Sequence, residues 1–385
     1  MSSKLFVLVG VGVFVATQFA RHGMEAVWTI FGIGAALLGL GLLVFVHELG
    51  HFLGGKLTGM AMPSFQVGFG KPIYSKLIGE TEWNLCPIPL GGAVRFVGED
   101  AEETGDVRKL AQEPGREGLL DDRRWFHNAS AGAQLLTLFL GPAFSVLFAI
   151  PLLFVCFAVW GVADPNSPAI VDSVAPGYPA EKAGIRAYDR IRRIGAVDVH
   201  SAADARAAVK AAGAGTKRVE LERDGKVVAL DVDLLKKADG AVIGVAFQVA
   251  KKPISVVESS GLAISEATSA TIAQARGLYA ILTGQMSLRM VSGPVGVITI
   301  SGESAKKGPA EYLTILAMIT IGLGITNLLP IPVLDGGRMV LTAMRAVVGR
   351  RIAKLYEVPT LIAGLAVILL LFIAATMNDI LSFYM

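Results

Sequence analysis

A motif of ionisable residues, His-Glu-Leu-Gly-His at positions 47–51, lies inside an apolar run long enough to cross a membrane. The run extends from Val27 to Leu53 and is otherwise almost free of charge. About 20 consecutive apolar residues suffice to span a bilayer as a helix. Ionisable side chains at membrane depth are costly to bury, and those found there usually serve a function. The motif therefore predicts a functional site within a membrane helix.

The spacing of the motif predicts a metal site. Residues four apart share one face of a helix, so His47 and His51 can bind the same Zn²⁺. Two positions of a tetrahedral site then remain for a third protein ligand and a water. Glu48 lies one step round the helix, where it can take a proton from that water as a general base. This pattern is typical of zinc hydrolases. The alternative is a pair of helix histidines that hydrogen-bond in the core of a transporter.

The composition indicates a polytopic α-helical membrane protein. Only 17% of the 385 residues are charged, and the net charge of +3 is not gathered into a basic patch with aromatic residues, so nucleic acid is not expected as a partner. About four core spans are predicted, together with an extra N-terminal span within residues 1–26 that lacks a good signal-peptide cleavage site. The apolar segments are Leu5–Ala20, Val27–Leu53, Ala133–Trp160, Leu313–Leu334 and Pro359–Met377.

The placement of Lys and Arg predicts the orientation of the spans. The loop between the second and third segments is rich in basic residues, and so is the stretch after Asp335. Both are therefore expected on the cytoplasmic side. Residues 161–311 then lie outside, and the motif at 47–51 lies near the cytoplasmic end of its helix.

Residues 167–250 are predicted to form an inserted α+β domain on the outer side. Strands are expected at 169–174 and 190–199, with a helix that Ser201 caps, and Asp224-Gly225 predicts a type I′ hairpin. The run Pro179–Ile185 followed by Asp189 resembles a PDZ domain, although Tyr188 stands where glycine is usual. Residues 253–311 are expected to form amphipathic helices at the outer membrane surface.

The remaining membrane core is predicted in two parts, 27–160 and 312–385. Within the first part, residues 65–97 read as a small membrane-associated β-hairpin sheet, residues 99–124 as a charged, irregular, solvated loop, and residues 133–160 as the next span. In the second part, Asp335 lies at the depth inferred for the two histidines, after a span that Pro330 and Pro332 interrupt. It is either the third metal ligand or the N-cap of the next helix. Asn327 could hold a substrate backbone or an oxyanion, or join two helices by hydrogen bonds.

Taken together, these motifs resemble the site-2 protease family of intramembrane zinc metalloproteases, in its bacterial RseP-like branch with a single PDZ domain. The resemblance covers most of the chain from Gly41 onward and includes Gly68-Phe69-Gly70, Gly91-Gly92 and the segment Asn327–Gly337. It implies Zn²⁺ bound by His47, His51 and Asp335, with Glu48 as the base. Asn327 and the hairpin residues Gly68, Phe69, Gly70, Gly91 and Gly92 are implied to hold an unwound substrate strand.

The family also implies a multi-pass protein of the bacterial inner membrane with a periplasmic PDZ domain. Its expected partners are the lipid bilayer and membrane-protein substrates, such as an anti-sigma factor or a signal-peptide remnant. The PDZ domain could bind a peptide C-terminus, exclude substrates with bulky outer domains, or dock other proteins. The alternative from another class is a non-proteolytic membrane scaffold or transporter, although a transporter should show internal repeats.

Overall fold

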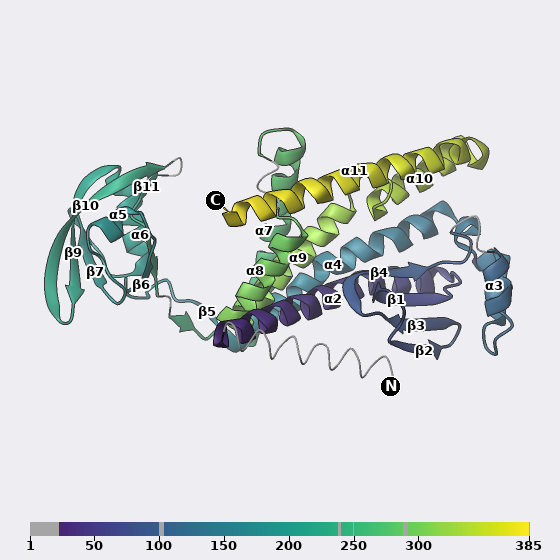
Figure 1. Ribbon diagram of the computed structural model, residues 1–385, viewed down its shortest axis with the longest axis horizontal. Coiled ribbons are helices and arrows are strands. Elements are labelled where there is room, and N and C mark those ends of the chain that lie inside the picture. The colour runs from purple at the N-terminus through teal and green to yellow at the C-terminus, as the bar shows by residue number, and fades with distance from the viewer. Residues whose placement is uncertain (1–22, 100–103, 238–239, 249, 288–291, 385) are drawn as a thin grey trace. The chain divides into compact units, whose positions relative to one another are not determined.

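The computed structural model describes residues 23–99, 104–237, 240–248, 250–287 and 292–384. Four of the described helices are long and apolar enough to cross a membrane, which agrees with the number of core spans predicted (Figure 1). They lie within α2 (Met24–Thr58), α4 (Ala131–Trp160), α9 (Pro309–Asn327) and α11 (Arg350–Tyr384). The predicted N-terminal span falls on residues that lie almost entirely outside the described ones. Two compact units result: unit 1 comprises residues 1–156 and 260–385, and unit 2 comprises residues 157–259.

Small residues let the helices of unit 1 approach closely. A Cβ on Gly32 of α2 would lie 2.9 Å from the carbonyl oxygen of Gly302 in α8 (Pro294–Lys307). A Cβ on Gly50, inside the His-Glu-Leu-Gly-His motif, would lie 2.3 Å from the carbonyl oxygen of Leu140 in α4. Such backbone contacts at small residues are how helices associate in a membrane. The glycine of the motif therefore serves to seat α2 against α4.

A buried carboxylate joins α11 to the start of α8. Asp379 accepts hydrogen bonds from the backbone N–H groups of Gly293 at 3.0 Å and Gly296 at 2.7 Å. The first N–H groups of a helix have no partner within it, and its N-terminus favours negative charge. A Cβ on Gly293 would lie 2.6 Å from an Asp379 carboxylate oxygen, so only glycine fits there. The carboxylate thus satisfies helix-end groups that would otherwise be unpaired.

The segment predicted as a β-hairpin forms a four-stranded sheet instead. Its strands are β1 (Ser64–Phe69), β2 (Tyr74–Ile78), β3 (Thr81–Leu85) and β4 (Ile88–Arg95), in the order β2-β3-β1-β4. Strand β1 is parallel to β3 and antiparallel to β4. The tight turn after β2 brings β3 to one side of β1, and the segment after β3 crosses to the other side of β1, where β4 pairs. Strand β4 consequently lies at an edge of this sheet.

The prediction of a solvated, irregular loop at 99–124 is wrong for its described part. This stretch contains α3 (Thr104–Leu110) and two short 3-10 helices, η1 (Glu117–Leu120) and η2 (Asp122–Arg124). Val107, Ala111 and Leu119 are buried together with Ala61. The guanidinium of Arg116 is also buried and donates to the carbonyl of Pro63 at 2.7 Å. The apolar residues that build this small core are too widely spaced among charges to form an evident helical period.

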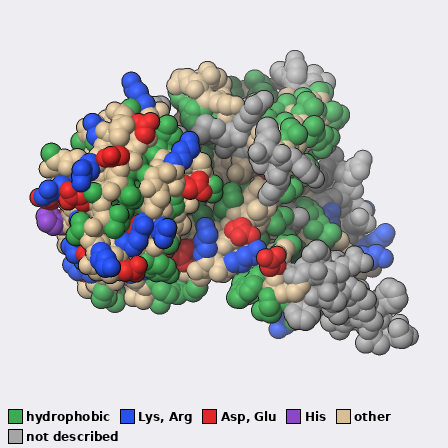
Figure 2. Space-filling model, turned by 60° about the vertical axis from the view of Figure 1, so that its left-hand side comes forward, with side chains coloured by type: hydrophobic (Ala, Val, Ile, Leu, Met, Phe, Trp, Pro, Cys, Tyr) green, Lys and Arg blue, Asp and Glu red, His purple; other side chains and the backbone are tan. Residues whose placement is uncertain are grey.

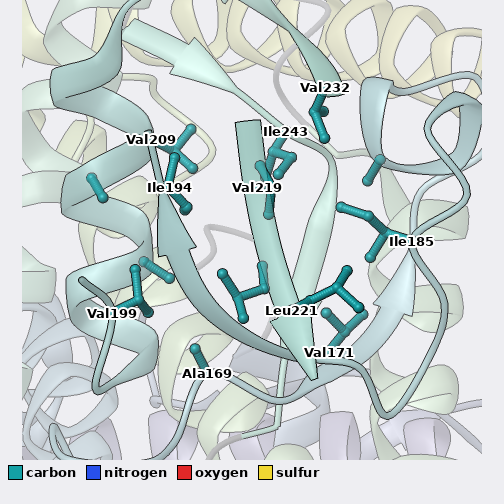
Figure 3. Packing of buried hydrophobic residues seen from close by; sticks show 14 of the residues in the cluster. Ala169, Val171, Ile185, Ile194, Val199, Val209, Val219, Leu221, Val232 and Ile243 are labelled. Carbon is teal, nitrogen blue, oxygen red and sulfur yellow. The ribbon is translucent and has the colours of Figure 1, made fainter. Parts of the chain in front are cut away.

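Unit 2 is an α+β structure built on a five-stranded sheet of order β11-β10-β9-β7-β8 and a separate pair, β12-β6. Apolar side chains from both sheets and from the helix α6 interlock in its core (Figure 3). Side chains of both charge signs are interspersed over the face of unit 2 that Figure 2 turns toward the viewer. The elements are β6 (Val171–Val174), α5 (Pro179–Lys182), β7 (Arg190–Ile194), β8 (Val197–Asp198), α6 (Ala202–Ala212), β9 (Gly215–Arg223), β10 (Lys226–Lys237), β11 (Gly240–Val242) and β12 (Val245–Phe247).

Two turns of unit 2 bear on the sequence predictions. Asp224 and Gly225 have φ values of 51° and 75°, as both central residues of a type I′ turn require, so the predicted hairpin is confirmed. Tyr188 has a φ of 69° where glycine was expected. Its turn therefore keeps the glycine-type conformation with a tyrosine in it, at a cost of about 1–2 kcal/mol.

Two short strands, β5 (Val162–Ala163) and β13 (Lys251–Lys252), pair near the ends of unit 2. The chain then continues through α7 (Val256–Leu282), α8 and α9, and α10 (Asp335–Val348) follows the proline-containing segment after α9. Helix α8 packs against α2 and α9 within unit 1. The placement of 253–311 at the outer membrane surface stays a prediction.

Candidate metal centre

Three predicted ligands meet in unit 1. His47 and His51 come from α2, and Asp335 is the first residue of α10. The Oδ2 atom of Asp335 lies 3.2 Å from Nε2 of His47 and 3.3 Å from Nε2 of His51. The two Nε2 atoms lie 3.3 Å apart, and all three side chains are buried. Residues 284 positions apart in the chain thus bring two imidazoles and one carboxylate to a single point.

Hydrogen bonds from α4 hold both imidazoles in place. Nδ1 of His51 lies 3.0 Å from the carbonyl oxygen of Thr137, which can only accept, so the proton is on Nδ1 and the Nε2 lone pair faces Asp335. Nδ1 of His47 lies 3.0 Å from Oγ of Ser145. Such partners orient metal-binding histidines and set their tautomer. A Cβ on Gly141 would lie 2.2 Å from Nε2 of His51, so glycine is required where α4 passes the site.

These separations fit a tetrahedral metal ion. Zinc–nitrogen and zinc–oxygen bonds of about 2.0–2.1 Å place tetrahedral ligand atoms about 3.3 Å apart. The three observed separations are 3.2, 3.3 and 3.3 Å. A carboxylate oxygen and an imidazole lone pair in such contact repel one another unless a proton or a cation lies between them. Two imidazoles and a carboxylate are also a ligand set of zinc enzymes that keep one position open.

Glu48 lies beside the three ligands but is held by the sheet. Its Oε2 atom accepts a hydrogen bond from the backbone N–H of Val94 in β4 at 3.1 Å. A Cβ on Gly92 would lie 2.8 Å from Cγ of Glu48, so the strand can pass this side chain only with glycine there. Glu48 as a whole is 9% exposed and lines the same cavity as the ligands. It is placed to exchange a proton with a molecule in that cavity.

The cavity has a volume of about 350 Å³ and gathers most of the predicted site residues. Asn327, at the end of α9, lines it together with Gly91 and Gly92 of β4. Gly68, Phe69 and Gly70 do not line it; they end β1 and begin the following turn. The Phe69 ring occupies the space beside Gly91, where a Cβ would come within 2.3 Å of it. Of the four predicted substrate-binding glycines, Gly91 and Gly92 therefore line the cavity, whereas Gly68 and Gly70 do not.

Sequence reasoning missed three residues of this site. Thr137 and Ser145 contact the histidines from α4, and Arg338 lines the cavity one turn after Asp335. Arg338 also pairs with Glu99, which follows β4. Ser145 and Thr137 carry no spacing signal, since they become neighbours only when α4 packs on α2. Arg338 lies three residues after the Asp335 ligand, and that helical spacing could have indicated it.

The fold and site define a multi-pass membrane protein with a buried centre of two histidines and one aspartate. Residues 35–371 match the model of the family described as Peptidase family M50, and the chain belongs to this family. A protein of Rhizobium meliloti, named as a candidate zinc metalloprotease, is 34% identical over 366 residues, covering 89% of this chain and 94% of the relative. A protein of Clostridium acetobutylicum with the same kind of name is 29% identical over 356 residues, covering 91% and 98%.

Proposed function

We propose that this protein is an intramembrane zinc metalloprotease of the site-2 protease type, which cleaves transmembrane segments of other proteins. The observation that carries the proposal is the centre itself: three ligand atoms 3.2–3.3 Å apart, two of them from a helix able to span a membrane, with a carboxylate beside them. Membership of a peptidase family and relatives named as candidate zinc metalloproteases support it.

His47, His51 and Asp335 would hold the zinc ion, which when bound polarises a peptide carbonyl and makes a water more acidic. Glu48 acts as general base on the attacking water and then returns the proton to the leaving amine. The N–H of Val94 holds one Glu48 oxygen at 3.1 Å, which leaves the other oxygen for this exchange. The side-chain amide of Asn327 in the cavity wall can donate to a substrate carbonyl or to a developing oxyanion.

A transmembrane substrate must be unwound before its peptide bonds can react, and its freed backbone groups then need partners. The edge of β4 that faces the cavity, with which no described strand pairs, can supply them. The N–H of Val94 points away from β1 toward Glu48, and backbone groups of a strand alternate in direction, so those of Gly92 point the same way. An extended substrate strand added at this edge would run past Glu48. Gly68, Phe69 and Gly70 support the strand from behind.

The same proposal places the protein in a bacterial inner membrane, with the metal centre toward the cytoplasmic side. Unit 2 is then a periplasmic PDZ domain, which would exclude substrates with bulky outer domains or dock a peptide. Anti-sigma factors and signal-peptide remnants are the proposed substrate classes. The proposed location, orientation, domain type and substrate classes all rest on the resemblance of the sequence motifs to the site-2 protease family.

The decisive experiment compares cleavage and metal content in purified variants. Glu48→Gln should retain about one zinc per chain yet lose at least 10³-fold in cleavage of a membrane-embedded reporter, since it removes the base but no ligand. Asp335→Ala should lose bound zinc as well as activity. Glu82→Gln, in β3 and away from the cavity, is the matched control and should behave as wild type. Undiminished cleavage by Glu48→Gln would overturn the mechanism.

A further inference from the structure

Unit 2 has a cavity of its own, far in sequence from the metal centre. Its volume is about 680 Å³, and it lies between β12 and α6, with the end of β6 beside it. Apolar side chains from all three elements line it: Val174, Val209, Ile243 and Phe247. The proposed proteolytic chemistry uses none of these residues. The cavity is therefore a separate candidate binding site.

One edge of β12 is available to a further strand. Among the described strands, β12 pairs with β6 alone. The carbonyl of Gly244 and the N–H of Gln248 both form hydrogen bonds with the segment that contains β6. The pairing of β12 with β6 is irregular, but the extra residue lies in β6. The backbone groups along β12 therefore alternate regularly in direction, and those of Val245 and Phe247 point to the edge opposite β6. Both residues also line the cavity, which is thus bordered by backbone groups that no described strand pairs with.

The charge around this cavity has a single sign. Its 15 lining residues include two cations, Arg206 and Lys210, and no carboxylate. Both cations are exposed on α6, one helical turn apart. The guanidinium of Arg206 lies over the ring of Phe247, 5.9 Å from its centroid. The stem of Lys210 lies beside Gly240 of β11. The two charges thus line the cavity from one helix, four residues apart.

Their spacing matches the repeat of an extended chain. Four residues of helix advance by about 6 Å. Two residues of strand advance by about 6.6–6.8 Å and return the side chain to the same face. A strand laid between β12 and α6 would therefore present side chains i and i+2 to the two cations in turn.

Peptide binding by strand addition is what the resemblance to PDZ domains already implies for this groove. We propose, beyond that, that the peptide bound along β12 belongs to a partner protein and carries two acidic side chains two residues apart, Glu-x-Glu in pattern. Arg206 and Lys210 select the two carboxylates, and an apolar residue on the same face enters the cavity. The site does not depend on the proposed proteolytic activity, because the two cavities share no lining residue.

The test uses the full-length protein in detergent and fluorescein-labelled, C-terminally amidated peptides read by fluorescence anisotropy. The probe is Ser-Glu-Thr-Glu-Thr-Val-Thr. Its isomer Ser-Glu-Glu-Thr-Thr-Val-Thr has the same composition and charge, but its glutamates point to opposite faces. A third peptide replaces both glutamates with glutamine and is made with an amide end and with a free carboxylate end.

We expect the probe to bind about threefold more tightly than the isomer and about tenfold more tightly than the amidated glutamine peptide. Arg206→Gln or Lys210→Gln should each remove the preference for the probe over its isomer. Both residues are exposed on α6, so neither change should unfold the unit. Lys226→Gln, an exposed cation outside the cavity, is the matched control and should retain the preference.

Other outcomes overturn the proposal. Equal affinity for probe and isomer would show that net charge alone is recognised. Binding that needs only the free carboxylate end would indicate capture of a peptide C-terminus instead. Failure of every peptide to bind at millimolar concentration would show that the cavity is not a site for acidic strands.

Discussion

Gly92 is a residue whose missing side chain decides the geometry around Glu48. A Cβ there would lie 2.8 Å from Cγ of Glu48 and 2.8 Å from Cγ1 of Val44, with the carbonyl oxygen of Gln66 at 2.9 Å. No single movement relieves all three contacts. We therefore expect Gly92→Ala to shift β4 or Glu48 at a cost of about 1–3 kcal/mol. Carried into the transition state, this cost corresponds to a loss of about 5- to 150-fold in kcat.

The measurement is cleavage of a membrane-embedded reporter, with metal content as the second readout. Zinc should be retained, because Gly92 touches none of the three ligands in the described contacts. Gly34→Ala is the control: it lies in α2, as Glu48 does, and has open space at its Cβ position. Equal activity of Gly92→Ala and Gly34→Ala would show that the close approach of β4 is not needed.

The residues of the metal centre differ in how far the sequence could predict them. The two histidines follow from helical spacing, and Asp335 from a match in membrane depth, because each signal is local. The partners of the histidine rings, Thr137 and Ser145, depend on how α4 packs against α2, and packing between helices leaves no periodic trace in one sequence. The resemblance to a known family does not identify Thr137 and Ser145 as partners of the histidine rings either.

Elements of unit 2 are joined by a buried ion pair with a defined pH dependence. Asp189 accepts from the N–H of Arg186 and from the guanidinium of Arg223 in β9 at 2.6–2.8 Å. Burial alone would raise the pKa of Asp189, but the Arg223 guanidinium and the Arg186 N–H outweigh it and hold the pKa below its ordinary value. The folded pKa thus lies below the unfolded value of about 3.9, so folding favours the charged carboxylate.

The stabilising contribution of Asp189 should accordingly be complete above about pH 5 and disappear as the pH falls through the lowered pKa. We expect Asp189→Asn to destabilise unit 2 at pH 7 by on the order of 2 kcal/mol and to flatten the loss of stability in acid. Amide hydrogen exchange in β9 of the intact protein, corrected for intrinsic rates, measures both effects. Asp198→Asn, which breaks an exposed pair with Arg193, is the control and should leave the stability of unit 2 nearly unchanged. An unchanged acid profile in Asp189→Asn would contradict the assignment.

Among the helices and strands, the sequence predicts features that depend on neighbouring residues, but not the pairing of strands that are distant in the chain. The Asp224-Gly225 turn and the helix that Ser201 caps depend on neighbouring residues only, and both are present. The sheet of β1–β4 was underestimated because the parallel pairing of β1 with β3 joins strands that the sequence does not place side by side. The sequence also gives no sign of the small core around Leu119, because its apolar residues are too widely spaced among charges to show a helical period.

At the scale of the whole molecule, helix α4 is the element that separates the segments expected on one side of the membrane from those expected on the other. Helix α4 has 30 residues, about 45 Å, which exceeds a hydrocarbon core of about 30 Å. The basic segment between α2 and α4 adjoins one end of it, and unit 2 follows the other. The metal ligands of α2 lie in its second half, toward the basic segment. If α4 spans, unit 2 lies across the membrane from that segment.

Single introduced cysteines can test this orientation, because the two native cysteines are buried. Lys226→Cys is exposed in unit 2, and Lys76→Cys is exposed in β2 of the basic segment. The excess of Lys and Arg between α2 and α4 predicts that this segment lies in the cytoplasm. A membrane-impermeant maleimide added to intact cells whose outer barrier is permeabilised should therefore label Lys226→Cys and leave Lys76→Cys unlabelled until the cells are lysed. The opposite pattern would reverse the orientation and move the metal centre to the outer side, whereas labelling of both sites in intact cells would mean that α4 does not span.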